Sequence, residues 1–273
     1  MCHYNCDALI DTNLTLEHKN LSSSSLILQY HIRNIVIFGT PNFIVLSQLL
    51  TTLNYKKVSK HYLISRFKYI FIPYLLVGVF YCYSESLLTA SSFKKQFIEN
   101  VVLGQWYGYF IIIMQFFVLS YLIYKVNYKL FNSKLLLLSL LIVHQSYLYH
   151  FIHNDHFHKL VTHYYPLSEN TMFLGWIFYF FLGGYIGYNY ESILSFLEKY
   201  LIIVIMLALG SYVLFISISG EDYWNVTSFT YTLTLYNSLM FFVLVGICMY
   251  FKTMLLKLLE YFHSLFTYCT LLF

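Results

Sequence analysis

The chain has 273 residues, of which 59% are hydrophobic and only 10% charged, and its mean hydropathy is +0.63. This composition excludes an ordinary soluble domain. The formal net charge of +4 fits contact with anionic membrane lipid and gives no reason to expect a nucleic-acid partner.

Long apolar stretches follow one another along the chain after a polar tail, residues 1–25. Their residue ranges are 27–53, 69–88, 106–124, 135–152, 172–188, 200–218, 236–251 and 258–273. Most have a length close to the ~17–25 residues that a helix needs to cross a bilayer. A membrane β-barrel would instead show alternating segments of about ten residues. We therefore predict an all-α, polytopic membrane bundle of about eight transmembrane helices, with residues 26–273 as its single domain.

The basic residues sort into two sets when the connections between the stretches are taken alternately. One set holds eleven: Lys56, Lys57, Lys60, Arg66, Lys68, Lys125, Lys129, Lys134, Lys199, Lys252 and Lys257. The other holds Lys19, Lys94, Lys95 and Lys159, and Arg33 lies inside the first stretch. Because cytoplasmic connections carry the excess of Lys and Arg, the first set is predicted to be cytoplasmic. The chain is then a multi-pass cell-membrane protein with its N-terminal tail outside.

The first stretch contains Arg33 and, further along, Pro41, two residues after Gly39. A cationic side chain within a span is costly and usually faces a polar cavity, so Arg33 is a candidate for binding an anionic substrate. The alternative is that Arg33 lies close enough to the outer boundary for its side chain to reach water. Pro41 removes a backbone hydrogen bond and predicts a kink in this helix.

Two residues near the outer boundaries are further candidates for binding a substrate. Trp106 begins the third stretch, where the default role of an aromatic side chain is to anchor the helix at the headgroups. Glu169 precedes the fifth stretch, where its carboxylate could bind sugar hydroxyls or amines, or could instead help to cap the next helix. Gly183 and Gly187 form a GxxxG pattern, which predicts close helix packing.

The connection after the fourth stretch is rich in histidine. It contains His150, His153, Asp155, His156, His158 and His163, and His153, Asp155 and His158 could converge on zinc or copper. No ligand spacing repeats, however, and a polar loop tolerates histidine freely. We therefore predict a solvated loop without a metal.

Several segments resemble the membrane acyltransferase-3 family. These are YLISRFKYIFIPY at residues 62–74, NIVIFGTPNFIVLSQLL at 34–50 and WIFYFFLGGYIGY at 176–188. The resemblance implies a helical bundle that transfers an acyl group from a cytoplasmic donor, acyl-coenzyme A, to a sugar hydroxyl outside, with no bound cofactor. It makes Arg66 a candidate for binding the donor phosphate, which Arg can contact bidentately. The alternative is a cytoplasmic anchor.

Within the family, four segments are similar to members associated with export or O-acylation of the biofilm polysaccharide poly-β-1,6-N-acetylglucosamine. They are QYHIRNIVIFGTPNFIVLSQLLTTLNY, FIENVVLGQWYGYF, HYYPLSEN and DYWNVTSF. This resemblance implies export of the polysaccharide as the function, with O-acyl transfer (succinyl or acetyl) as the alternative. It also implies a partnership with the membrane glycosyltransferase that makes the polymer.

The chain departs from the family pattern at both ends. The pattern begins with a helix that carries a basic residue and a catalytic histidine, whereas residues 1–13 contain no such helix and His3 lies in a polar context. Its last helices would continue beyond Phe273. We therefore expect a chain truncated at both ends with impaired acyl transfer, and we assign no catalytic residue.

Overall fold

The computed structural model describes residues 31–89, 91–105, 109–219 and 226–271, with side chains up to Lys252 apart from that of Tyr109. Within these ranges every element is a helix and no strand is present. Six helices are long and apolar enough to cross a membrane. The predicted all-α membrane bundle is therefore confirmed, and the chain is a multi-pass membrane protein.

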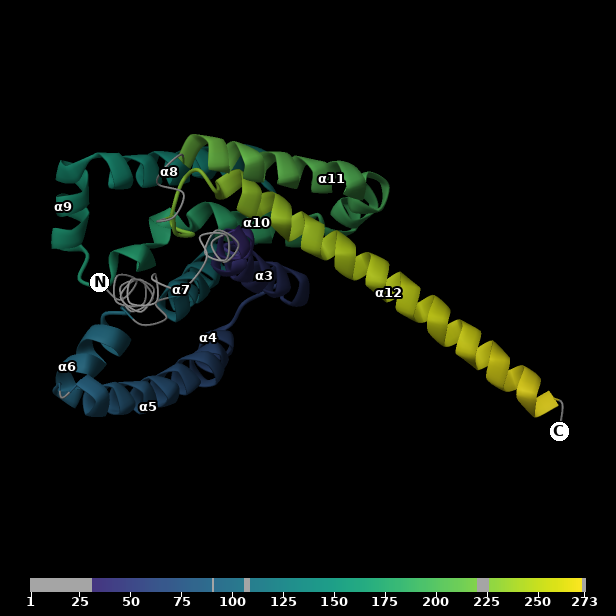
Figure 1. Ribbon diagram of the computed structural model, residues 1–273, viewed down its shortest axis with the longest axis horizontal. Helices are drawn as coiled ribbons and strands as arrows, with labels where there is room; N and C mark the ends of the chain where they lie inside the picture. The colour runs from purple at the N-terminus through teal and green to yellow at the C-terminus, as the bar shows by residue number, and fades with distance from the viewer. Residues whose placement is uncertain (1–30, 90, 106–108, 220–225, 272–273) are drawn as a thin grey trace, which may run out of the picture.

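The helices follow one another with short connections (Figure 1). Their bounds are α3 Gly39–Asn54, α4 Lys60–Arg66, η1 Phe67–Phe71, α5 Ile72–Thr89, α6 Phe93–Phe97, η2 Ile98–Val102, α7 Tyr109–Asn127, η3 Tyr128–Asn132, α8 Lys134–His153, α9 Asp155–Tyr164, η4 Glu169–Thr171, η5 Phe173–Gly175, α10 Ile177–Tyr188, α11 Tyr190–Ser219 and α12 Thr234–Leu271. Candidate spans comprise His31–Asn54, Lys60–Thr89, Phe110–Asn132, Lys134–His153, Tyr190–Ser219 and Thr234–Lys252.

The number of spans differs from the predicted eight at two places. The stretch 172–188 forms the short helix η5 and then α10, which has 12 residues and is about 18 Å long at 1.5 Å per residue. The stretch 236–251 and the described part of the last stretch, residues 258–271, belong to one continuous helix, α12, of 38 residues. Lys252 and Lys257 therefore lie on that helix and not in a loop. Hydropathy could not show this, because a polar residue interrupts an apolar run without interrupting a helix.

Helix α10 lies at the centre of the bundle (Figure 1), and most of its side chains are buried. Its main neighbour is α3, and the predicted GxxxG packing is confirmed. A Cβ atom at Gly183 would collide with the backbone of Val45, and one at Gly187 would lie 2.7 Å from Cβ of Thr52. Gly183 lies against Val45, and Gly187, further along α10, lies against residues further along α3. The two helices therefore run parallel.

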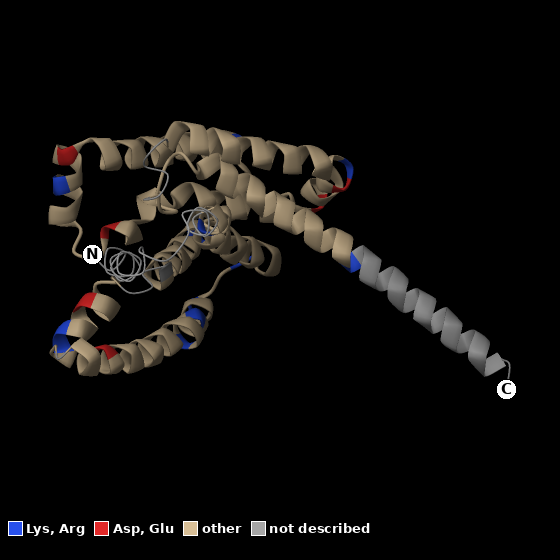
Figure 2. Cartoon of the chain, viewed as in Figure 1, with Lys and Arg blue, Asp and Glu red and all other residues tan. Residues whose placement is uncertain are grey.

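The connections gather at two opposite ends of the bundle, in the alternating order that the basic residues predict. At one end the side-chain amide of Asn189 donates to Oδ1 of Asn132 over 2.9 Å. At the other, the backbone N–H of Ser168 donates to the carbonyl of Leu103 over 2.6 Å. This second end, hereafter the α6–α9 end, carries α6 and α9 (Figure 1), while charged side chains are sparse along the helices between the ends (Figure 2).

The first span is interrupted at residues 36–38, immediately before α3. The backbone N–H of Gly39 donates to the carbonyl of Val36, three residues earlier. The next helical hydrogen bond runs from the N–H of Asn42 to the carbonyl of Phe38. Pro41 lacks an N–H and its ring disfavours a helical residue four positions earlier, which explains why the break precedes it. The predicted kink is thus observed, displaced by one turn toward the N-terminus.

The second span is longer than its apolar stretch, 69–88. It runs from Lys60 to Thr89 through one π-helical segment, Phe67–Phe71. Arg66 accordingly lies within a continuous helix and not ahead of one as the sequence suggested.

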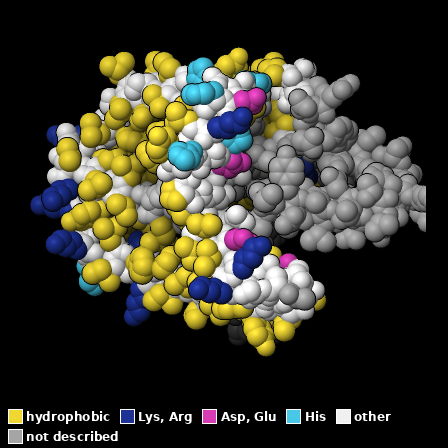
Figure 3. Space-filling view, turned by 90° about the vertical axis from the view of Figure 1, so that its left-hand side faces the viewer, with side chains coloured by type: hydrophobic (Ala, Val, Ile, Leu, Met, Phe, Trp, Pro, Cys, Tyr) yellow, Lys and Arg dark blue, Asp and Glu magenta, His cyan; other side chains and the backbone are white. Residues whose placement is uncertain are grey.

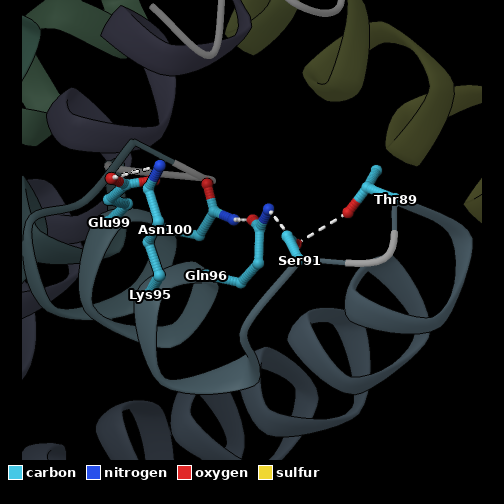
Figure 4. Close-up of polar contacts among 6 residues, drawn as sticks. All are labelled: Thr89, Ser91, Lys95, Gln96, Glu99 and Asn100. Carbon is cyan, nitrogen blue, oxygen red and sulfur yellow. Dashed lines mark hydrogen bonds and ion pairs between the residues drawn. The ribbon is translucent and has the colours of Figure 1, made fainter.

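The connection after α5 is helical and folds back along that helix. The Tyr74 hydroxyl donates to the carbonyl of Val101 over 2.9 Å. At the tip, a chain of hydrogen bonds joins Thr89, Ser91, Gln96 and Asn100 (Figure 4). The loop expected at residues 89–105 is therefore an ordered helical hairpin.

Candidate functional site

Arg66 lies against aromatic rings of α4 and α7. Its guanidinium carbon is 5.2 Å from the ring centre of Tyr62 and 5.6 Å from that of Phe117. Such cation–π contacts are attractive because the ring face is electron-rich. Lys68, expected beside Arg66, instead lies over the exposed ring of Tyr69. Of this pair, Arg66 is therefore the cation that faces the bundle, in a half-buried position.

Hydroxyl and amide groups continue from Arg66 into the bundle. The Tyr62 hydroxyl is 2.9 Å from Oγ1 of Thr51. Gln48, which lies on α3 with Thr51, accepts a hydrogen bond from the Ser120 hydroxyl and donates one to the Thr52 hydroxyl. Gln48, Thr51 and Ser120 are all buried. This inner polar cluster, formed by Gln48, Thr51, Tyr62 and Ser120 beside Arg66, places hydroxyl, amide and guanidinium groups side by side at this end of the bundle.

Glu169 lies at the opposite end of the bundle, where it pairs with a histidine of α9. Its Oε2 atom is 2.9 Å from Nε2 of His158, and both side chains are about two-fifths exposed. The Ser168 side chain makes no capping hydrogen bond to the short helix η4. Glu169 therefore links α9 to η4 and leaves part of its carboxylate accessible to solvent.

A hydrogen-bond network holds the segment around Glu169 in place. The side-chain amide of Gln115 on α7 donates to the Tyr165 hydroxyl, and Tyr165 in turn contacts Thr171. The indole N–H of Trp176 donates to the carbonyl of Asn170 over 2.8 Å. The segment that carries Glu169 is thus held in place by α7 on one side and by Trp176 on the other.

The histidine-rich connection is not a loop, because residues 155–164 form α9. Asn154 caps this helix by accepting from the N–H of Phe157. Figure 3 shows histidine, Lys and acidic side chains gathered on this face of the molecule. His153 contacts the Tyr231 hydroxyl at 3.1 Å, away from the His158–Glu169 pair. In the described part of the chain no three His, Cys, Asp or Glu side chains are placed to hold a metal ion.

The structure does not assemble the predicted residues into one site. Arg66 and Glu169 belong to opposite ends of the bundle, and Arg33 lies half-buried on the helical segment before the break. Trp106 lies outside the described residues. The roles proposed for these four residues in binding stay predictions.

A group of buried polar residues in the centre of the bundle was missed from the sequence. Nε2 of His144 on α8 is 3.3 Å from the Thr234 hydroxyl on α12. Asn237 on α12 donates to the Tyr179 hydroxyl on α10 over 3.1 Å. All four side chains are at most 2% exposed. One signal was available: His144 is an ionisable residue in the middle of an apolar stretch, where such residues usually serve function.

Comparison with known proteins agrees with the sequence motifs. An acyltransferase domain matches residues 11–269. A probable poly-β-1,6-N-acetyl-D-glucosamine export protein of Staphylococcus epidermidis is 75% identical over 250 residues, which cover 91% of this chain and 70% of the relative. Its counterpart in Staphylococcus aureus strain MSSA476 is 66% identical over 250 residues, 91% of this chain and 71% of the relative.

No solved structure shows significant similarity to the chain. The resemblance to these polysaccharide export proteins and to their wider family, which the sequence segments indicated, is confirmed. The match to the acyltransferase domain covers most of the described helices. The chain belongs to the acyltransferase-3 family of membrane proteins.

Proposed function

We propose that the chain exports poly-β-1,6-N-acetylglucosamine across the cell membrane. The observation that carries this proposal is 75% identity over 91% of the chain to a relative named as a probable exporter of that polymer. Identity of this extent includes the helices that bear every polar cluster described above.

The arrangement of polar groups is compatible with the passage of a hydrophilic chain. Buried polar side chains occur beside Arg66, in the centre around Tyr179, and beside Glu169. Polar residues within membrane helices usually face the bundle interior and mark substrate pathways. In the orientation that we propose, the Arg66 end faces the cytoplasm, and the α6–α9 end and the N-terminal tail lie outside. The membrane glycosyltransferase that makes the polymer would deliver it at the Arg66 end.

The second candidate is O-acyl transfer to the polysaccharide, which the match to an acyltransferase domain favours. Acyl-coenzyme A would be the donor substrate, and its phosphate could bind Arg66, whose planar guanidinium accommodates phosphate better than an ammonium group does. Transfer also needs a base that takes the proton of the accepting hydroxyl. The chain offers buried His144 and the accessible pair of His158 and Glu169.

The test replaces the exporter in a polysaccharide-producing strain with this chain. Polymer is measured at the cell surface and inside the cell, and O-acyl groups are measured by NMR. Export predicts that removing the gene lowers surface polymer while polymer accumulates inside, and that this chain restores the surface fraction. Surface polymer that stays normal but lacks acyl groups would instead establish transfer. The variant Arg66→Lys distinguishes export from O-acyl transfer at a single residue. The control is Lys125→Arg, which also exchanges one basic residue for another at the same end of the bundle.

A further inference from the structure

Three helices bring polar side chains together in the middle of the bundle. Asn237 of α12 and Tyr179 of α10 share a hydrogen bond of 3.1 Å, and both are at most 1% exposed to solvent. On α12 the next polar side chain, Thr234, contacts His144 of α8. These groups lie among apolar side chains of the largest core cluster, which includes Phe178.

Asn42 of α3 lies at the level of Tyr179, as the register of the two parallel helices shows. Gly183 faces Val45, and Gly187 faces Leu49 and Thr52. One turn earlier on each helix, Tyr179 is level with Pro41 and Asn42. Asn42 is only 7% exposed. The junction of α3, α10 and α12 therefore holds Asn42, Tyr179 and Asn237.

Two of these side chains have hydrogen-bonding atoms that the surrounding protein does not satisfy. Neither Nδ2 nor Oδ1 of Asn42 has a hydrogen-bond partner within the described part of the chain, and Oδ1 of Asn237 also has none there. An unsatisfied buried polar group costs about 1–3 kcal/mol, so such groups call for an explanation.

The other buried polar contacts join one helix to another, which explains why polar side chains are present there. This explanation does not apply to Asn42. Gln48 and Ser120 join α3 to α7 by a hydrogen bond, as polar residues commonly do between membrane helices. Asn42 forms no such link with any described residue, and a leucine of similar size would fill its place without leaving polar atoms unsatisfied. A side-chain amide here is useful if another molecule supplies the missing partners.

We propose that Asn42, Tyr179 and Asn237 form an intramembrane site that binds the hydroxyl and acetamido groups of a saccharide chain. The Asn42 amide offers one acceptor and two donors, and Asn237 offers a further acceptor. An acetamido group carries a complementary N–H and carbonyl. The helix break at residues 36–38 lies one turn before Asn42 and lets the outer segment of the span move separately to admit the chain. This inference rests on the proposed export function and specifies where the polymer is held.

The first experiment separates ligand binding from packing. In cells that depend on this chain, Asn42→Leu is expected to preserve or raise the stability of the purified protein yet to lower surface polymer at least tenfold. Asn42→Ser, which keeps a donor and an acceptor, should restore part of the loss. The control is Ser211→Ala, because Ser211 is equally buried but bonds to the carbonyl of Ala208 in its own helix; it should leave surface polymer unchanged. Normal surface polymer with Asn42→Leu would overturn the proposal.

The second experiment does not depend on export. The five cysteines are replaced by serine, and Asn42→Cys is compared with Ile44→Cys, at a position 1% exposed in the apolar core. A hydrophilic maleimide should label the first variant and not the second, and N-acetylglucosamine oligosaccharides should slow the labelling. Equal labelling of the two variants, or labelling that the oligosaccharides leave unchanged, would contradict the site. If the unmodified chain fails to restore surface polymer while protection is still seen, the export function fails and the saccharide site stands.

Discussion

Gly183 on α10 lies directly against the backbone of Val45 on α3, with no space for a side chain between them. This contact sets the distance between the two helices at the centre of the bundle. Backbone atoms cannot turn aside as a flexible side chain can, so a larger residue would force the helices apart.

We therefore predict that Gly183→Ala destabilises the protein by about 1–3 kcal/mol, the usual range for inserting a methyl group into a packed core. The control is Gly210→Ala on α11, where a Cβ atom would meet nothing within 4 Å and alanine favours the helix. Unfolding of both purified variants in mixed detergent and SDS measures the difference. Equal stability of the two variants would show that the α3–α10 contact is looser than described.

Tyr62 and Thr51 provide a test of the inner polar cluster. Tyr62→Phe keeps the ring beside Arg66 and removes one buried hydrogen bond, which should lower stability by about 0.5–1.5 kcal/mol. Thr51→Val should produce a similar loss, and the double variant should lose less than the sum because both changes remove the same interaction. Additive losses in this double-mutant cycle would indicate that the two hydroxyls do not interact.

The pair of Glu169 and His158 is expected to matter more for the substrate than for stability. Half-exposed pairs of this kind contribute about 0–1 kcal/mol, so Glu169→Gln should change the unfolding curve little. Surface polymer should nevertheless fall severalfold, since the accessible carboxylate is lost. Glu198→Gln, an exposed acidic residue on α11, provides the control at the other end. Identical surface polymer in both variants would remove Glu169 from the substrate path.

The orientation of the bundle can be tested in intact cells. Lys57 lies in the connection after α3 and His156 on α9, and both are exposed. A membrane-impermeant thiol reagent should label His156→Cys and should label Lys57→Cys only after the cells are opened. Labelling of Lys57→Cys from outside, with His156→Cys protected, would invert the proposed topology.

Much of this architecture could be predicted from the order of the residues. Alternating lysines correctly indicated which connections lie together, because the cost of moving charge through lipid acts on every loop. The glycines of α10 indicated a close helix contact, although not that α3 would be the partner. Hydropathy misjudged helix length, since it measures lipid preference and not backbone continuity: α4 carries four polar or basic residues, Lys60, His61, Ser65 and Arg66, and is still helical.

The site was predicted less well than the fold. Arg66 and Glu169 were chosen as individual residues, and the alternation of basic residues already placed them at opposite ends of the bundle, but no sequence pattern reveals the side chains that surround each of them. Asn42, Tyr179 and Asn237 are more than 50 positions apart along the chain and share one level only because α3, α10 and α12 pack together there. Their relation depends on packing, which a single sequence does not display.

The short length of α10 has a consequence for the membrane itself. Its 12 residues reach about 18 Å, whereas the hydrocarbon layer is about 30 Å thick. A helix so enclosed by protein need not match the lipid in length. We therefore expect the apolar barrier to be thinnest along α10, so that an exported polymer would leave water for only a few sugar rings at a time.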